Sequence, residues 1–246
     1  MGRIDDLITA ALRAIPPKPA DDAKQSDKKR YSELISQVVA AAFGEELRLR
    51  GLQGARPTEP GDEDTSGAER RMAGGIGAKR VDVTWATDES GLLLGISIKT
   101  INFRDTRTKN FQKNLTNRRG DMLFEAVTLH RRFPYAVLAG FLFLDKGAAE
   151  DGTDRRSSTF ENAHTRLRLF TGREDPAGRD EQYERLYILL LDAAPPFAGK
   201  VQVFAAGAFE KPITLEGIFD ELVRLVAERN SDFYECVEGQ LRPVSS

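Results

Sequence analysis

Asp82 and Lys99 lie on two neighbouring predicted strands, and their side chains together could support metal-dependent hydrolysis. Asp82 is in the strand-like run 79–85, and Lys99 lies near the end of the apolar run 92–100. The turn-rich stretch 86–91 joins the two runs, which predicts a hairpin with the carboxylate beside the amine. A carboxylate binds divalent cations and an ammonium stabilises developing negative charge. The pair therefore supplies two groups that a metal-dependent phosphodiesterase site needs, a metal ligand and a cation.

The hydrophobic pattern predicts the elements that position this pair. Apolar residues at helical spacing predict a helix over 4–15, followed by a polar linker to Arg30. A second helix is predicted over 31–50 and ends at Gly51. Residues 52–78 are rich in Gly, Pro, Asp and Glu, which is typical of a flexible surface loop.

Helices and strands alternate after the strand pair. Further helices are predicted over 116–132, from the Ser158–Glu161 capping box to Gly172, and over 215–230 with Thr214 as its cap. Further strands are predicted over 135–144, 185–191 and 200–205, the first of them buried on both faces. This order predicts an α/β fold with a mixed central sheet flanked by helices. Residues 1–30 form an N-terminal helix and linker, and 31–246 form one domain.

The order helix, strand with Asp82, strand with Lys99, helix, strand resembles the core of the PD-(D/E)XK nuclease superfamily, which includes many restriction endonucleases. The resemblance covers about residues 31–145. Val81 stands before Asp82 in place of Pro, and Ser97 stands where the second strand acid is expected. The resemblance implies a restriction endonuclease-like core. It also implies a magnesium-dependent DNA endonuclease of the restriction or anti-phage type.

The resemblance assigns chemical roles to the strand residues. Asp82 becomes a magnesium ligand, and the backbone carbonyl of Ile98 supplies a second hard oxygen. Lys99 orients or deprotonates the attacking water, or stabilises the charged transition state. Because Ser97 replaces the second strand acid, the strands supply one carboxylate, Asp82, to the expected metal site. Some restriction enzymes of this family then take the missing acid from a neighbouring helix.

Three helix acids are candidates for that role. Glu33 lies off the apolar face of the helix over 31–50, and the family often takes a Glu from this helix, so Glu33 ranks first as a catalytic residue. Glu125 ranks next and Asp121 follows closely, because they lie one turn apart on the helix after Lys99 and either could complete the metal site. A solvated polar helix face explains the same acids without a function.

A basic, amide-rich stretch follows Lys99. Seven basic residues and one acid occur over 99–119, in a chain whose net charge is −2. Such side chains contact phosphates, and Asn, Gln and Arg can also read base edges. The residues expected to contact nucleic acid are Arg104, Arg107, Lys109, Lys113, Asn114, Asn117 and Arg118. A solvated charged loop is the alternative explanation.

Composition limits the other function classes. The longest apolar stretch, 135–144, is too short to cross a bilayer, and the N-terminus has no apolar signal core. A cytoplasmic protein without a membrane partner is therefore expected. Cys236 is the single cysteine, which excludes an intramolecular disulfide and, with two histidines, argues against a zinc site.

Two alternatives to an endonuclease stay open. One is a non-catalytic nucleic-acid-binding module on the same fold, which Ser97 favours. The other is a protein-binding subunit of a larger defence assembly, with the loop over 52–78 as its docking element. Duplex DNA is the expected partner of the endonuclease, and the resemblance allows a homodimer.

Overall fold

A five-stranded mixed sheet forms the centre of the molecule. The computed structural model describes residues 2–58, 70–73, 78–193 and 199–244. The strands of the central sheet are β3 (Val83–Thr87), β4 (Gly91–Ile101), β5 (Val137–Asp145), β6 (Arg185–Asp192) and β7 (Lys200–Ala205), in that order across the sheet. β4, β5 and β6 are parallel, and the edge strands β3 and β7 are antiparallel to their neighbours. The predicted α/β class with a mixed sheet is therefore confirmed.

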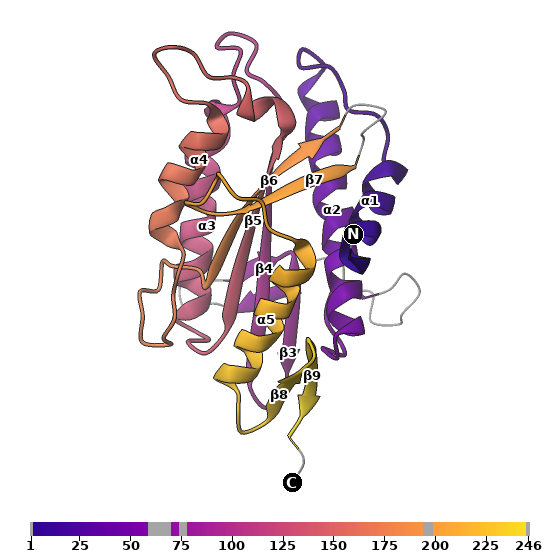
Figure 1. The fold of residues 1–246 in the computed structure, drawn as a ribbon, viewed down its shortest axis with the longest axis vertical. Coiled ribbons are helices and arrows are strands. Elements are labelled where there is room, and N and C mark those ends of the chain that lie inside the picture. Colours follow the sequence, from indigo (N-terminus) through magenta and orange to yellow (C-terminus); the bar gives the residue numbers. More distant parts are fainter. Residues whose placement is uncertain (1, 59–69, 74–77, 194–198, 245–246) are drawn as a thin grey trace.

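Helices cover both faces of this sheet (Figure 1). The helices are α1 (Arg3–Ala14), α2 (Gln25–Leu49), α3 (Leu115–His130), α4 (Thr159–Leu167) and α5 (Leu215–Arg229). α1, α2 and α5 share one apolar core with one face of the sheet, and α3 and α4 share a second core with the other face. Strand β5 lies between the two cores and is buried over 137–144, as predicted for a strand covered on both sides.

Helix α2 begins at Gln25, well before its predicted start at Tyr31. The run before Tyr31 is polar and rich in lysine, which led to the prediction of a linker. In the structure these polar residues are the solvent-facing first turns of the helix, while Tyr31 and Ile35 are buried against the core. This difference brings two lysines close to the candidate site described below.

Part of the region predicted as a loop over 52–78 is strand. β1 (Arg70–Ala73) pairs with β2 (Ala78–Val81) in a separate antiparallel ladder, and residues 59–69 and 74–77 lie outside the described residues. The loop prediction is wrong at 70–73 and at Ala78, because a short ladder is held by backbone hydrogen bonds that the side-chain pattern does not reveal. The C-terminal hairpin of β8 (Tyr234–Val237) and β9 (Gln240–Pro243) is also held by such a ladder, and no element was predicted there.

The predicted helix caps are present. Ser158 Oγ accepts a hydrogen bond from the Glu161 N–H, and the Glu161 carboxylate accepts one from the Ser158 N–H, which completes the capping box of α4. Helix α4 ends at Leu167, and a short 3₁₀ turn over 168–170 fills the interval before Gly172. Thr214 Oγ1 caps α5 by accepting from the Gly217 N–H.

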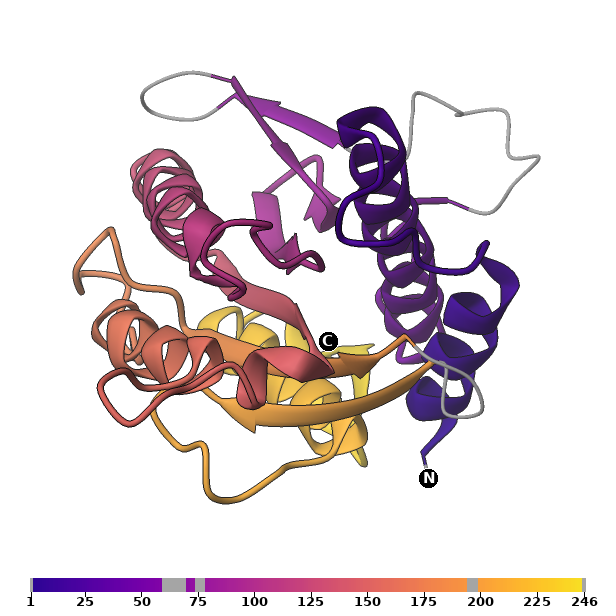
Figure 2. The ribbon, with the colours of Figure 1, turned by 90° about the horizontal axis from the view of Figure 1, so that it is seen from above.

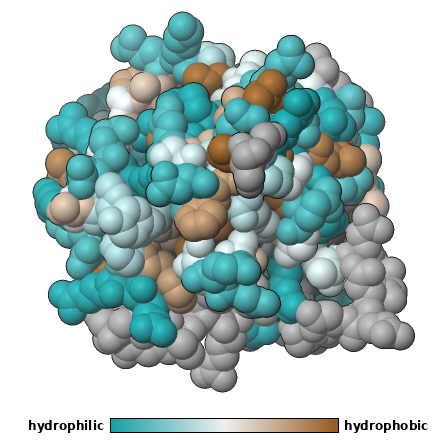
Figure 3. All heavy atoms as spheres, turned by 90° about the horizontal axis from the view of Figure 1, so that it is seen from below, coloured by the Kyte–Doolittle hydropathy of each residue, from teal (hydrophilic) through white to brown (hydrophobic). Residues whose placement is uncertain are grey.

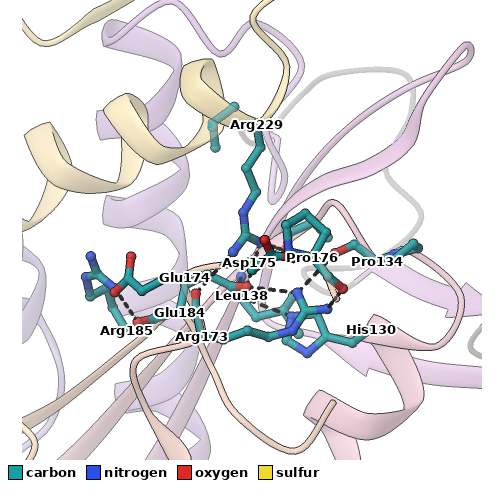
Figure 4. A network of polar contacts seen from close by, with 12 residues as sticks. His130, Pro134, Leu138, Arg173, Glu174, Asp175, Pro176, Glu184, Arg185 and Arg229 are labelled. Carbon is teal, nitrogen blue, oxygen red and sulfur yellow. Dashed lines mark hydrogen bonds and ion pairs between the residues drawn. The ribbon is translucent and has the colours of Figure 1, made fainter. Parts of the chain in front are cut away.

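A buried ionic cluster around Glu184 fastens α3 and α5 to the sheet (Figure 4). The Glu184 carboxylate accepts hydrogen bonds from Arg173 at 3.1 Å, from Arg229 at 2.6 Å and from the Leu138 N–H at 2.6 Å. His130 Nε2 lies 3.3 Å from the same carboxylate. The side chains of Glu184, Arg173 and His130 are fully buried. Because each charge faces an opposite charge, the cluster is tolerated in the interior.

The face of the molecule seen from below is largely hydrophilic (Figure 3). Seen from below, hydrophobic residues form scattered patches among polar ones (Figure 3). None of the helices in the described part of the chain has both the length and the apolar character needed to cross a bilayer.

Candidate active site

Asp82 lies at the break between β2 and β3, where the chain passes from one ladder to the other. β2 pairs with β1 and β3 pairs with β4, so the single strand predicted over 79–85 is divided at this residue. Asp82 Oδ2 accepts a hydrogen bond of 2.6 Å from the backbone N–H of Ile98. This bond holds the carboxylate against β4, next to Lys99, so the predicted juxtaposition of acid and amine is present.

Lys99 contacts two carboxylates. Its Nζ atom lies 3.8 Å from Asp82 Oδ2 and 3.1 Å from Glu125 Oε2. The exposed fractions of the Asp82, Lys99 and Glu125 side chains are 14, 16 and 5%. Burial alone would lower the pKa of Lys99, but the Glu125 and Asp82 carboxylates outweigh it and raise that pKa above its usual value. The three side chains thus form a compact charged group, called here the acid–lysine cluster.

The alternation of β4 explains why Glu125 reaches Lys99. Ile96 and Ile98 belong to the core shared with α2, whereas Ile101 belongs to the core shared with α3. Residues of odd number on this part of the strand, Lys99 among them, therefore face α3. Glu125 is in the middle of α3 and is buried on the side that packs on the sheet.

Two residues that the sequence did not indicate as part of the site, Gly140 and Tyr183, hold α3 close to the sheet. Gly140 on β5 leaves room for the helix, because a Cβ atom there would lie 2.6 Å from Met122 Cε. The Tyr183 hydroxyl donates a hydrogen bond of 3.0 Å to the Met122 carbonyl. Burial, with the nearby Glu125 charge, raises the pKa of Tyr183 well above its usual value, so the phenol keeps the proton that it donates. Both contacts fix the helix one turn before Glu125.

The other two candidate acids lie farther out in the same groove. The groove has a volume of about 910 Å³, and its walls include Glu33, Asp121 and all three members of the acid–lysine cluster. Glu33 is 57% exposed and lies 3.7 Å from Lys29, and Asp121 is 56% exposed and lies 3.5 Å from Arg118. The structure therefore brings Glu125 to Lys99 and leaves Glu33 and Asp121 as exposed groove residues. Ser97 is 1% exposed.

The donor set of the cluster is compatible with magnesium. Among the described residues, no group of three or more His, Cys, Asp or Glu side chains gathers in an arrangement that could hold a metal by itself. Magnesium in phosphoryl-transfer sites uses one or two carboxylates, and the rest of its ligands are waters and substrate phosphate. Asp82, which accepts from the Ile98 N–H, and Glu125 supply two carboxylates that both contact Lys99, and this donor set suits an ion completed by water and substrate phosphate and not a closed protein cage.

The predicted nucleic-acid contacts divide into two sets. Arg104, Lys113, Asn114 and Arg118 line the groove. Arg107, Lys109 and Asn117 are exposed but belong to no described wall of it. The structure adds three basic residues that the sequence pattern did not single out, Lys28, Lys29 and Arg80. A helix predicted to begin at Gln25 would have indicated the two lysines. Lys28 lies one helical turn before Ser32 and therefore on the same face of α2, which lines the groove.

Comparisons with protein-family models, with curated proteins and with solved structures found no match to this chain.

Proposed function

We propose that this protein is a magnesium-dependent DNA endonuclease of the PD-(D/E)XK type, with a role in restriction or anti-phage defence. The observation that carries the proposal is the acid–lysine cluster, in which Asp82 and Glu125 both contact Lys99 inside a groove. The element order α2, β3, β4, α3, β5 supports it, because the cluster draws its members from the β2–β3 break, β4 and α3.

The chain's own residues divide the chemistry among them. Asp82 and Glu125 would hold the metal, with the Ile98 carbonyl as a further oxygen ligand. Magnesium, when bound, neutralises charge on the scissile phosphate and lowers the pKa of the attacking water. Lys99 keeps a positive charge beside these carboxylates and would stabilise the negative charge that develops on the phosphate. Hydrolysis adds water across one P–O bond and leaves a phosphate end and a hydroxyl end.

Cleavage assays with matched variants test the proposal. The wild-type protein is expected to cleave duplex DNA with Mg²⁺ or Mn²⁺ and not with EDTA. Asp82→Asn and Lys99→Ala should each abolish cleavage while the circular dichroism spectrum stays that of the wild type. Asp88→Asn is the control, because this exposed acid lies in the turn of the same hairpin. Full cleavage by both Asp82→Asn and Lys99→Ala would contradict the proposal.

Ser97 supports a second candidate function, a non-catalytic nucleic-acid-binding module. Its side chain is buried on β4 and supplies no charge, so the strand itself offers no second acid. This candidate predicts salt-dependent duplex binding by the wild-type protein and no cleavage with either metal. Cleavage that depends on Asp82 rules it out.

A further inference from the structure

The groove that contains the acid–lysine cluster has a second basic wall on helix α2. One wall is the segment after β4 together with the start of α3, where Arg104, Lys113 and Arg118 lie. The other wall is the first half of α2, with Gln25, Lys28, Lys29 and Ser32. Seen from above, α2 and α3 stand on the two sides of the segment that follows β4 (Figure 2).

The two walls are connected at the floor. Asn102, at the end of β4, is buried, and its Nδ2 atom donates a hydrogen bond of 3.0 Å to Ser32 Oγ on α2. Phe103 follows and contacts the Lys28 ammonium at 5.8 Å from its ring centroid. The position of α2 relative to the end of β4 is therefore fixed by contacts between side chains.

The groove concentrates positive charge in a protein that is negative overall. Seven of its described wall residues are Lys or Arg and five are Asp or Glu, whereas the whole chain has a net charge of −2. Two of the five acids, Asp82 and Glu125, are those assigned to the metal. A concave surface with an excess of one charge attracts ligands of the opposite charge. The charge balance of the groove therefore favours a polyanion.

The two lysines of α2 are placed to meet such a ligand. Lys28 Nζ donates a hydrogen bond of 3.0 Å to the Asp21 carbonyl, which positions the ammonium at the wall of the groove. Lys29 is 72% exposed next to Glu33. Both lie near the N-terminal end of α2.

We infer that nucleic acid occupies this groove with its backbone phosphates against both walls, and that Lys28 and Lys29 are phosphate contacts on the α2 wall. The inference rests on the proposed endonuclease function and adds to it the path of the substrate. Helix α2 thus forms one side of the binding surface, and the basic segment after β4 forms the other.

The salt dependence of binding tests the inference separately from cleavage. The probe is a fluorescently labelled mixed-sequence DNA duplex, measured by anisotropy with Ca²⁺ in place of Mg²⁺ over a series of salt concentrations. The test variant is Lys28→Gln/Lys29→Gln, and the control is Lys211→Gln/Arg242→Gln, which removes two exposed charges outside the groove. The slope of log K against log salt should become shallower by about 2 in the test variant, since each phosphate contact contributes about 0.9. The control should keep the wild-type slope.

The outcomes separate the inference from the function on which it rests. An unchanged slope in Lys28→Gln/Lys29→Gln overturns the α2 wall, even if the wild-type protein cleaves DNA. A shallower slope supports the wall, even if no metal supports cleavage and the endonuclease proposal fails. Binding of polyglutamate as tightly as the duplex overturns the assignment to nucleic acid and favours an acidic protein partner.

Discussion

Glu125 Oε2 lies 3.1 Å from Lys99 Nζ, although 26 positions separate the two residues in the chain. Through this contact Lys99 has a carboxylate partner on α3 in addition to Asp82 at the β2–β3 break. Helix α3 thus provides a second carboxylate, Glu125, and Ser97 on β4 provides none. The candidate site is composite, and its integrity depends on how α3 packs on the sheet.

Replacing Glu125 tests whether this acid completes the site. Glu125→Gln keeps the shape of the side chain and removes a carboxylate assigned to the metal, so cleavage should fall on the order of 100-fold or more, because the metal that stabilises the charge of the transition state is held less well. Calcium binding, measured by calorimetry without substrate, should weaken in parallel. Asp121→Asn is the control on the same helix, one turn away and exposed, and should leave both measurements close to the wild type.

Glu33→Gln tests whether the second metal-binding acid comes from α2 or from α3. Glu33 lies on the opposite wall and is exposed, so its loss is expected to affect cleavage far less than the loss of Glu125. If Glu33→Gln abolishes metal binding and Glu125→Gln does not, the second acid comes from α2. The sequence-based ranking of Glu33 above Glu125 is then correct.

Gly140 is predicted to control the distance between α3 and the sheet. In Gly140→Ala the new methyl group would clash most closely with Leu186 Cδ2 and would lie 2.6 Å from Met122 Cε, so these two side chains must repack and we expect α3 to be displaced. Overpacking of this kind costs about 1–3 kcal/mol of unfolding free energy. Cleavage should fall as well, because Glu125 moves with the helix. Urea unfolding and the cleavage assay measure the two effects.

Gly120→Ala is the matched control for Gly140→Ala. Gly120 is also in this region, within α3 itself, but a Cβ atom there would meet nothing within 4 Å. The change should stabilise the helix by up to about 1 kcal/mol and leave cleavage unchanged. If the two alanine variants behave alike, close approach at Gly140 does not position α3.

The hairpin with Asp82 and Lys99 could be predicted from the sequence because its signals are local. The two strand-like runs and the turn-rich stretch between them indicate a strand pair without reference to the rest of the chain, although the division at Asp82 between β2 and β3 is not indicated. The helix acid could not be chosen in the same way. Whether Glu125 or Asp121 meets Lys99 depends on the packing of α3, and that packing depends on Gly140 and on Tyr183, which lies on a later segment.

The α2 wall was missed for a related reason. Lys28 and Lys29 are polar residues in a polar run, and their helical state follows from the anchoring of Tyr31 and Ile35 in the core. Tertiary packing therefore extends the helix beyond the stretch that shows apolar periodicity. The position of these lysines opposite the segment after β4 depends on the contact between Asn102 and Ser32, which no local pattern indicates.

The Glu184 cluster is predicted to be essential for stability. Glu184→Gln would leave the buried Arg173 and Arg229 guanidinium groups without their shared carboxylate, which should cost about 3–5 kcal/mol of unfolding free energy. Glu174→Gln removes an exposed partner of Arg185 and should cost less than about 1 kcal/mol. Equal effects of the two changes in urea unfolding would contradict a structural role for the cluster.

Acid should weaken the contribution of Glu184. Burial would raise the pKa of this carboxyl, but the contacts with His130 and Arg229 outweigh it and hold the pKa below its usual value. A depressed pKa in the folded state means stability that is present above the unfolded pKa, about 4.3, and is lost as pH falls below it. The difference in unfolding free energy between the wild type and Glu184→Gln should therefore shrink as pH falls from about 5 towards 3.

His164 is predicted to make the fold sensitive to mild acid. Its ring is buried among Phe160, Phe204 and Phe209, and burial lowers the pKa of His164 to about 4. The unfolded chain, with a histidine pKa near 6.5, binds a proton first as pH falls, so unfolding is favoured below that value. The expected loss is about 2 kcal/mol of unfolding free energy between pH 7 and 5.

His164→Asn removes this titration and keeps a hydrogen-bond acceptor. His164 Nδ1 accepts a hydrogen bond of 3.1 Å from the Gly207 N–H, and the Asn side-chain oxygen can take its place. The variant will be less stable at pH 7, because the smaller side chain leaves a cavity beside the phenylalanine rings. Its unfolding free energy should nevertheless change less than that of the wild type between pH 7 and 5, in urea titrations at each pH. A loss as large as that of the wild type would mean that another group carries the acid sensitivity in this range.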